Sequence, residues 1–220
     1  MKLLPERTVE RLSQYRRVLQ RVLDKGTESI YSHELAQLLH ITPVQVRRDI
    51  MLMGHSGTLR KGYNIKNIIK LIGDIIDCND IQKVAIIGIG NLGEALLKYL
   101  SINNNTKLKL SAVFDNDEEK IGKSFDGIVC YNIKSLKKIV ARDNITIGIL
   151  TVPPKHANEI ANNMKDAGFL GIINYTPVSI NIKDIFVEQY DVITSLEKVA
   201  YFAKPKNVAL LQCEDKDNNC

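Results

Sequence analysis

"VAIIGIGNLGEALLKYL", residues 84–100, is the stretch that decides the fold of the larger part of this 220-residue chain. A run of apolar residues precedes three glycines in the spacing GxGxxG, at Gly88, Gly90 and Gly93, and a helix-forming run follows them. The pattern predicts a buried strand, a tight turn and a helix. The first glycine permits the turn, the second lets the backbone approach a pyrophosphate, and the third lets the helix pack on the strand.

A carboxylate at the expected distance from these glycines supports a dinucleotide site. The segment "KLSAVFDNDEEKIG", residues 109–122, predicts a second strand that ends at Asp115, 22 residues after Gly93. A carboxylate there accepts hydrogen bonds from both hydroxyls of an adenosine ribose and repels a 2′-phosphate. The sequence therefore predicts NADH or NAD⁺ as the cofactor. The glycine turn contributes a continuous set of expected cofactor residues: Gly88, Ile89, Gly90, Asn91, Leu92 and Gly93.

Strand and helix patterns continue to alternate after Asp115. "TIGILTVP" (146–153) and "LGIINYTPVSI" (170–180) are typical of strands, and "HANEIANNMKDAGF" (156–169) is typical of an amphipathic helix. Alternation of this kind predicts a parallel sheet, whose ligands bind at the carboxyl ends of the strands. Four further cofactor residues are expected there: Thr151, Val152, Pro153 and Asn174. A last helix is expected in "DVITSLEKVAYFAK" (191–204).

Positive charge is concentrated in the first third of the chain. Residues 1–70 hold 13 Lys and Arg against 6 Asp and Glu, a net charge of +7, whereas the remainder has a net charge of −2. A basic segment on a mildly acidic body favours a polyanion as the partner of that segment.

Two short helical patterns joined by "LHI" (39–41) predict a helix-turn-helix in this basic segment. The first, in "SHELAQLLHI" (32–41), is expected to have Ser32 as N-cap and to bury Leu35, Leu38 and Leu39. The second, in "TPVQVRRDIMLMG" (42–54), has Thr42 as N-cap, Pro43 at the first helical position and Gly54 at its end. A longer helix precedes them, with expected ends at Thr8 and Gly26 and apolar positions at Val9, Leu12, Tyr15, Leu19, Val22 and Leu23.

The second short helix has side chains that suit a major groove. With Val46, Ile50 and Met53 turned inward, Gln45, Arg47, Arg48 and Asp49 are expected to face outward. Arginine pairs with guanine, glutamine pairs with adenine, and either can hold phosphates. "GTLRKGYNI" (57–65) predicts a basic hairpin that turns at Lys61-Gly62 and acts as a wing; a three-helix bundle with a solvated face is the alternative. The expected DNA-binding residues are Thr42, Gln45, Arg47, Arg48, Arg60, Lys61 and Tyr63.

These patterns predict an α/β chain with an N-terminal winged helix-turn-helix domain and a C-terminal doubly wound, parallel-sheet Rossmann domain. The expected bounds are 1–77 for the DNA-binding domain, 78–190 for the nucleotide domain, 191–205 for the last helix and 206–220 for a partly disordered tail. No apolar run approaches the roughly 20 residues of a membrane span, and the four scattered cysteines contain no CxxC pair. Because charged residues interrupt the first eleven positions, we expect no signal peptide. We expect a cytoplasmic protein with reduced thiols and no metal site.

The order of domains and motifs resembles the Rex family of bacterial redox-sensing transcriptional repressors. The resemblance runs from about Thr8 to Phe202 and rests on "TPVQVRRD", "GIGNLG", "FDNDEEKIG", "ILTVP", "GIINYTPV" and "DVITSLEKVAYF". It implies a homodimer that binds an inverted-repeat operator on double-stranded DNA, that NADH releases from the DNA, and whose C-terminal helix is swapped between subunits.

The resemblance also implies roles for single residues. Arg47 and Arg48 match the family's recognition-helix pair, and Tyr99 matches a tyrosine beside the nicotinamide. Arg17 and Asp191 match a pair that couples the domains across the dimer, with Leu196, Val199 and Tyr201 on the swapped helix. Three stretches depart from the family pattern: "MLMG" (51–54) replaces "SYFG", "TLRKGY" (58–63) replaces a glycine-rich wing, and Ser195 and Glu197 replace Glu and Gln.

Two other functions compete with a DNA-binding sensor. A small NAD-dependent dehydrogenase would need an acid or base beside the nicotinamide. Three of the four histidines, His33, His40 and His55, lie in the basic segment, and His156 is expected on the first turn of a helix. A module that merely binds nucleotide would leave the winged helix without a use.

Overall fold

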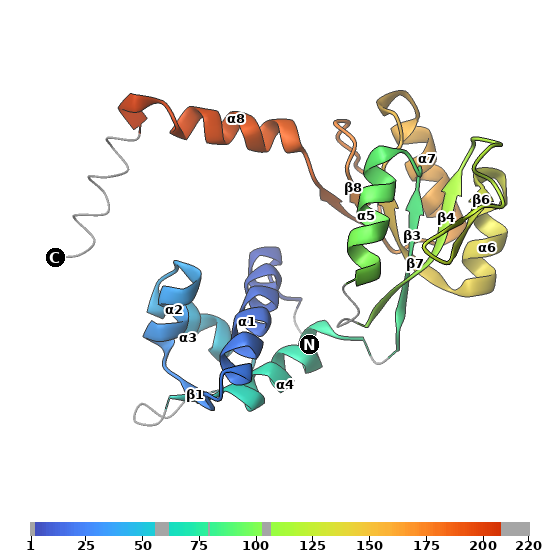
Figure 1. Cartoon of the computed structure of the whole chain (residues 1–220). Helices are drawn as coiled ribbons and strands as arrows, with labels where there is room; N and C mark the ends of the chain where they lie inside the picture. The colour runs from blue at the N-terminus through green and yellow to red at the C-terminus, as the bar shows by residue number, and fades with distance from the viewer. Residues whose placement is uncertain (1–2, 56–61, 79, 103–106, 208–220) are drawn as a thin grey trace. The chain divides into compact units, whose positions relative to one another are not determined.

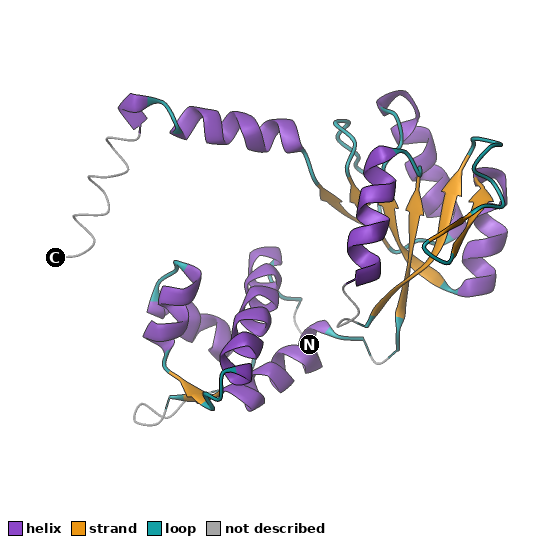
Figure 2. Ribbon diagram, viewed as in Figure 1, coloured by secondary structure: helices purple, strands orange, loops and turns teal. Residues whose placement is uncertain are grey.

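The structure is a computed structural model that describes residues 3–55, 62–78, 80–102 and 107–207. The chain divides into two compact units, residues 1–80 and 81–220. The first is mostly helical, and the second contains a mostly parallel sheet with helices on both faces (Figures 1 and 2). The predicted fold class, a helix-turn-helix domain followed by a doubly wound sheet, is confirmed.

The N-terminal unit combines helices with a small antiparallel sheet. Helices α2 (Ser32–Leu39) and α3 (Pro43–Leu52) form the predicted helix-turn-helix, between α1 (Glu6–Asp24) and α4 (Ile65–Ile76). Strands β1 (Ser29–Ile30) and β2 (Tyr63–Asn64) pair with Ile30 opposite Tyr63. Helix α4 was not predicted from the sequence, although its isoleucines at 65, 68 and 72 have helical spacing and are buried.

Two of the three predicted N-caps are wrong. Thr42 is confirmed, because its side-chain oxygen accepts a hydrogen bond from the Gln45 N–H at 3.2 Å. Helix α1 begins earlier than Thr8, after an extended Pro5, and Thr8 is buried within the first turn. Helix α2 is capped by Tyr31, whose backbone N–H donates to the Glu34 carboxylate at 2.7 Å. In both cases the preceding residue already has the extended backbone that a helix start needs.

The core of this unit is formed by all four helices. Leu38 and Val9, expected to be buried, are 50% and 39% exposed, because Ala36 completes the inward face of α2 and α4 covers α1 on another side. The largest buried side chains come from each helix in turn: Leu12, Tyr15 and Leu19 from α1, Leu35 from α2, Val46 and Ile50 from α3, and Ile65, Ile68 and Ile72 from α4.

A buried carboxylate joins α3 to α1. Asp49, predicted to face outward, is fully buried. Its two oxygens accept hydrogen bonds from the Arg11 guanidinium at 2.6 and 2.8 Å and from the Tyr15 hydroxyl at 2.7 Å. The prediction failed because Arg11 and Tyr15 lie on a different helix, about 35 residues away, so no local pattern on α3 signals that its one acidic residue has partners inside.

The C-terminal unit contains a seven-stranded sheet in the order β5-β6-β4-β3-β7-β8-β9, as far as the described residues show. Every neighbouring pair is parallel except β5 and β6. From β6 to β9 this is the order of a dinucleotide-binding sheet. The strands are β3 (Gln82–Ile87), β4 (Leu108–Asp115), β5 (Ser124–Phe125), β6 (Ile128–Asn132), β7 (Ile145–Leu150), β8 (Gly171–Asn174) and β9 (Phe186–Gln189).

Helices cover both faces of this sheet (Figure 1). On one face, Ala85 and Ile87 of β3 pack in a cluster with side chains of α6 (Leu136–Asp143) and α7 (Pro154–Ala167). On the other face, Val84 and Ile86 pack in a cluster with Leu97 of α5 (Asn91–Ile102). Because successive strand residues point to opposite faces, the continuous apolar run of β3 fills both cores.

Helix α8 (Val192–Phe202) follows the sheet, where a helix was predicted. Its apolar side chains are exposed, including Val192, Leu196 and Val199 at about 60% each. Asp191 is its N-cap, and its carboxylate accepts from the Ile193 N–H at 2.9 Å and from the Thr194 hydroxyl at 2.6 Å. A helix with an apolar stripe on its surface is suited to contact with another surface.

We expect Asp49→Ala to destabilise the N-terminal unit by about 3–5 kcal/mol, because it leaves the Arg11 guanidinium without its ion partner. Hydrogen exchange of α1 and α3 peptides in the intact chain, followed across a urea series, measures this loss. Arg48→Ala, an exposed change on the same helix, should alter stability by no more than about 0.5 kcal/mol.

The same pair makes the stability of this unit depend on pH. Burial raises the pKa of Asp49, but hydrogen bonds from Arg11, Tyr15 and Gln45 outweigh it and lower the pKa below its ordinary value. The stabilisation is therefore fully present above the ordinary carboxyl pKa of about 4 and is lost as the pH falls through the lower folded value. A wild-type advantage over Asp49→Ala that grew on acidification would contradict this assignment.

Candidate functional site

The N-terminal unit presents two arginines on the outer side of α3. Arg47 and Arg48 are both exposed, as predicted. The Arg47 guanidinium donates to the Ser32 hydroxyl of α2 at 3.1 Å, so this side chain is held beside the start of the neighbouring helix. Arg48 lies one position further along α3. Thr42 stands at the start of the same helix, so the exposed hydrogen-bonding groups lie near the N-terminal half of α3.

The other residues predicted to bind DNA are Gln45 of α3 and the residues of the predicted wing. Gln45 is half-buried, and its amide nitrogen donates to Asp49 at 2.9 Å. Tyr63 is half-buried in β2, where its ring lies 6.3 Å from that of His55. Arg60 and Lys61 lie outside the described residues, and Gly62, the second residue of the predicted turn, has φ +67°.

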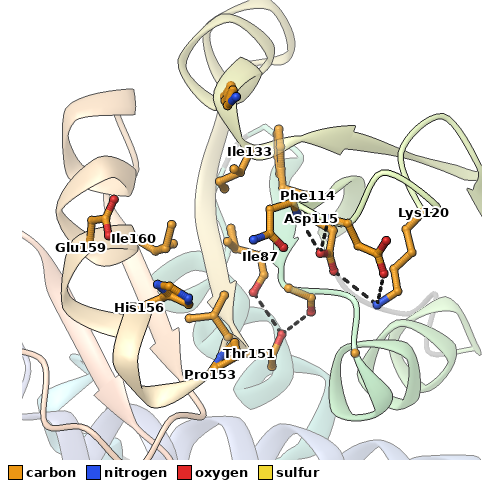
Figure 3. Close-up of a pocket in the computed structure, with 16 residues that line it drawn as sticks. Ile87, Phe114, Asp115, Lys120, Ile133, Thr151, Pro153, His156, Glu159 and Ile160 are labelled. Carbon is orange, nitrogen blue, oxygen red and sulfur yellow. Dashed lines mark hydrogen bonds and ion pairs between the residues drawn. The ribbon is translucent and has the colours of Figure 1, made fainter.

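A cavity of about 760 Å³ opens at the carboxyl ends of the central strands of the C-terminal unit (Figure 3). This is the edge at which doubly wound sheets bind ligands. Six of the residues predicted to bind a cofactor line it: Gly88, Gly90, Asp115, Thr151, Val152 and Pro153.

The three glycines of the turn have three different surroundings. Gly88 has φ +97°, and a Cβ there would lie 2.7 Å from the Thr151 carbonyl oxygen. A Cβ on Gly93 would overlap the Gly88 carbonyl oxygen, so the start of α5 can approach the turn only without a side chain. A Cβ on Gly90 would meet no described atom within 4 Å, and Gly90 lines the cavity. Gly90 is thus the position where the backbone is open to a ligand.

Thr151 joins the glycine turn to the neighbouring strand. Its hydroxyl lies 2.7 Å from the Gly88 carbonyl oxygen and 3.2 Å from the Ile87 carbonyl oxygen, within hydrogen-bond distance of both (Figure 3). Its backbone N–H also donates to the Ile87 carbonyl at 2.9 Å. These bonds continue the pairing of β3 with β7 past the end of the sheet. The floor of the cavity is therefore held from two strands.

Asp115 lies at the end of β4 and has a structural partner in the turn. One carboxylate oxygen accepts from the Ile89 N–H at 2.8 Å, and the other accepts from the Asn116 and Asp117 N–H groups. Lys120 places its ammonium 3.7 Å from Asp115 and 3.6 Å from Asp117 (Figure 3). Two carboxylates around one ammonium leave this end of the cavity with a net negative charge.

Part of the cavity wall was not predicted from the sequence. Ile133 and Lys134 follow β6, which was not predicted, and Glu159 and Ile160 lie on α7 with His156. His156 is on the first turn of that helix, as expected. The signal that could have located Ile133 is the apolar run before it, "IVCYNI" (128–133), which is typical of a short buried strand.

Tyr99 and Asn174, both predicted to bind the cofactor, lie apart from the described cavity wall. Tyr99 is exposed on α5 and is close enough to Tyr175 to affect its ionisation; burial first, then Tyr190 and Tyr99, raise the pKa of Tyr175. The rings of Tyr175 and Tyr190 stack at 5.1 Å. These residues follow β8 and β9, so an aromatic cluster occupies the other half of the sheet's carboxyl edge.

Asn174 organises the segment after β8. Its amide nitrogen donates to the Val178 carbonyl at 2.7 Å and to the Gln189 side chain at 2.6 Å, and its amide oxygen accepts from Thr176. The side chain is fully buried. These bonds hold Tyr175 and the residues around it in place, so the structure gives Asn174 a positioning role at this edge.

The residues predicted to couple the domains lie on α1 and α8, whereas the side chain of Ile89, from the glycine turn, is fully buried. Arg17 is exposed on α1, and Asp191, Leu196, Val199 and Tyr201 belong to α8 or its cap. Hydrogen bonds from Thr194 lower the pKa of Asp191, which keeps it anionic. Within the described residues, no cluster of three or more His, Cys, Asp and Glu side chains is suited to a metal ion, and no helix is long and apolar enough to span a membrane.

Two cysteines can be placed. Cys130 is buried in β6, where burial and the charge of Asp115 raise the pKa of its thiol to about 11, so it is protonated and unreactive at neutral pH. Cys78 is exposed. Cys213 and Cys220 lie outside the described residues.

The second and third glycines of the turn, Gly90 and Gly93, should respond differently to the same substitution. Gly93→Ala should destabilise the C-terminal unit by about 1–3 kcal/mol or more, because its methyl group meets backbone that cannot rotate away. Gly90→Ala should cost no more than about 1 kcal/mol, the loss of glycine at a helix start. Urea unfolding of the two variants measures the difference, and equal losses would mean that Gly93 is not the packing position.

Comparison with protein families matches both units. Residues 4–50 match the family described as a putative DNA-binding protein N-terminus, and residues 79–178 match the family described as a CoA binding domain. The two matches cover the helix-turn-helix and the nucleotide-binding part of the sheet, respectively.

Curated relatives match nearly the whole chain. The redox-sensing transcriptional repressor Rex of Bacillus cytotoxicus is 35% identical over 203 residues, which is 91% of this chain and 96% of the relative. The Rex repressor of Lactobacillus gasseri is 34% identical over 98% of this chain and 97% of its own length. That of Thermotoga petrophila is 33% identical, with 90% and 95% coverage.

Solved structures agree with these relatives. The structure of RSP, a Rex-family repressor, in complex with β-NAD⁺ and operator DNA has a TM-score of 0.85 at 26% identity and covers all of both chains. RSP in complex with β-NADH has a TM-score of 0.82 at 25% identity, covering 96% of this chain and 100% of its own. With a glycine turn at the edge of a doubly wound sheet, exposed arginines on a helix-turn-helix, and full-length relatives, this chain belongs to the Rex family of redox-sensing transcriptional repressors.

Proposed function

We propose that this chain binds NADH or NAD⁺ in the cavity of its C-terminal unit, binds an inverted-repeat operator through α3, and releases the operator when NADH is bound. The single observation that carries the proposal is the joint presence, in one chain, of a dinucleotide-type glycine turn beside Asp115 and a helix-turn-helix with two exposed arginines. Relatives named redox-sensing repressors and a similar structure in complex with β-NAD⁺ and operator DNA support it.

The cofactor's adenosine and pyrophosphate fit the described cavity. The open space at Gly90 and the N-terminus of α5, from Asn91 to Gly93, suit the pyrophosphate. The Asp115 carboxylate is suited to accept hydrogen bonds from the ribose hydroxyls, either in place of its hydrogen bond from the Ile89 N–H or in addition to it. Ile133 and Ile160 supply apolar walls for the adenine ring.

The nicotinamide half belongs at the other half of the same sheet edge, between Thr151 and the cluster of Tyr99, Tyr175 and Tyr190. The two cofactors share everything except this ring, which is neutral in NADH and cationic in NAD⁺. Burying a cation without a partner costs far more than burying a neutral ring. A closed state that buries the ring against tyrosines and apolar side chains therefore favours NADH.

DNA binding is assigned to the exposed face of α3. Arg48 is the candidate for a bidentate contact with guanine, and Arg47 and Thr42 are candidates for phosphates near the start of the helix. Arg60, Lys61 and Tyr63 are assigned to a wing that contacts the adjacent backbone or minor groove. An arginine that reads a base contributes about 1–3 kcal/mol of discrimination.

A homodimer places two such helices on an inverted repeat. The exposed apolar stripe of α8 at Val192, Leu196 and Val199 is assigned to the partner subunit, with Tyr201 and the helix exchanged between subunits. Arg17 and Asp191 are assigned to the contact that couples cofactor binding to the DNA-binding units. We assign the protein no catalytic role, since His156, the histidine that lines the cavity, lies on the wall shared with Ile160, in the adenosine half.

Asp115→Asn should weaken NADH binding and reduce the preference of the protein for NADH over NADPH. The change keeps an acceptor for the Ile89 N–H but removes the charge from hydrogen bonds that are each worth about 1.5–3 kcal/mol. Calorimetric titration with both cofactors measures the effect. Asp117→Asn is the matched control, because Asp117 lines the same cavity, and a preference that followed Asp117 would move the ribose contact there.

NADH and operator DNA should weaken each other's binding by the same factor, because the coupling is reciprocal. The measurement titrates NADH with and without a duplex selected by this protein from randomised inverted repeats, and then titrates the duplex with and without NADH. NAD⁺ should have a smaller effect. Gly90→Ala should bind the duplex normally and fail to respond to NADH. An NADH affinity unchanged by the duplex would reject the sensor function and leave a dehydrogenase as the alternative to test.

A further inference from the structure

The orientation of Gln45, on the proposed DNA-binding helix α3, is set by a buried side chain. Gln45 and Asp49 lie one turn apart on α3, and the Gln45 amide nitrogen donates to an Asp49 oxygen at 2.9 Å. The same carboxylate accepts hydrogen bonds from Arg11 and Tyr15 of α1 and is fully buried. Gln45 therefore contacts a group that is itself fixed by two partners on another helix.

The chemistry of this contact decides which end of the amide faces inward. The pKa of Asp49 lies below its ordinary value, because three hydrogen bonds outweigh the effect of burial, so the group is an anion at neutral pH. An ionised carboxylate only accepts hydrogen bonds. The amide of Gln45 must then present nitrogen to Asp49, and a flipped amide would place its oxygen against a buried anion.

The amide atom that faces Asp49 decides which amide atom of Gln45 faces outward. Because the two polar atoms lie on opposite sides of the amide carbon, the carbonyl oxygen faces away from Asp49. One of the two N–H bonds is used by Asp49, and the other remains. Gln45 therefore presents to a DNA groove one acceptor, its carbonyl oxygen, and one donor, its remaining N–H.

We propose that Asp49 is a positioning residue that fixes Gln45 with its carbonyl oxygen toward the major groove, so that Gln45 selects adenine, and then cytosine, at one position of the operator. Adenine and cytosine present amino donors in the major groove, at N6 and N4. Adenine also presents N7 to the remaining N–H, which ranks it first. The inference rests on the proposed function, because it names the base that the α3 face reads.

The same arrangement rejects the other two bases. Guanine presents O6 and N7, and thymine presents O4. Each base would therefore place an acceptor opposite the Gln45 carbonyl oxygen, which is itself an acceptor. A free glutamine would rotate its amide and donate to them. Here that rotation is blocked by the cost of turning an oxygen toward Asp49, and discrimination comes from the repulsive contact as much as from the attractive one.

The experiment is a selection by the full-length protein from duplexes that carry an inverted repeat with randomised half-sites. Gln45→Ala identifies the base pair that Gln45 reads, as the position whose preference it removes. At that position the wild type should enrich adenine, and then cytosine, over guanine and thymine by about 5- to 150-fold, the range expected for a good base contact.

Asp49→Asn should reduce this preference by about 5-fold or more, because an asparagine can accept or donate and so permits the Gln45 amide to flip. Preferences at the other base pairs should not change, which separates positioning from a general loss of structure. Tyr15→Phe is the matched control: it removes one hydrogen bond to Asp49 and leaves the Gln45 contact, so it should keep the preference.

A measurement on the wild type covers the case in which Asp49→Asn does not fold. At the Gln45 position, replacing adenine by purine, which lacks the N6 amino group, should weaken binding by about 5-fold or more. An enriched guanine or thymine at that position, or full binding to the purine duplex, would overturn the inference while leaving the proposed function intact. If the wild type enriches no inverted repeat at all, the proposed function fails first and this inference with it.

Discussion

The close approach of α5 to the end of β3 is the constraint on which the C-terminal unit depends. It requires a bare backbone at Gly93, where any Cβ would overlap the Gly88 carbonyl oxygen, and the Thr151 hydroxyl holds that same carbonyl. One oxygen thus ties together the first strand, its helix and the neighbouring strand β7. The turn and the start of α5 form one rigid edge, so the cavity beside them has a defined wall for a phosphate-bearing ligand.

A buried charge has the corresponding role in the N-terminal unit. Asp49 joins α3 to α1 through Arg11 and Tyr15, and the cost of burying its charge is offset only when all of its partners are in place. Together with the buried side chains of Val46 and Ile50, these contacts set which face of α3 turns inward. As a result Arg47 and Arg48 face outward, and Gln45 is held at the margin between the core and the surface.

Local patterns were sufficient for the elements whose periodicity is strong. The strand before Gly88, the helix after it, the end of β4 at Asp115 and the cap at Thr42 follow from the spacing of apolar, glycine and capping residues. Helix α4 and strands β6 and β9 were missed, because they are short or lie next to stronger signals. Because β6 was missed, Ile133 and Lys134 of the cavity wall, which follow it, were missed as well.

The sequence by itself determined the fold class, the cofactor turn and the family, because glycine geometry and hydrophobic period are properties of neighbouring residues. Only the tertiary structure decided the state of single polar side chains. Asp49 looked like a surface residue of α3 until α1 supplied Arg11 and Tyr15, and the amide of Asn174, an expected cofactor contact, is held in place by Val178, Thr176 and Gln189. Whether a polar group is available for binding depends on partners distant in sequence, because burial demands that its hydrogen bonds be met.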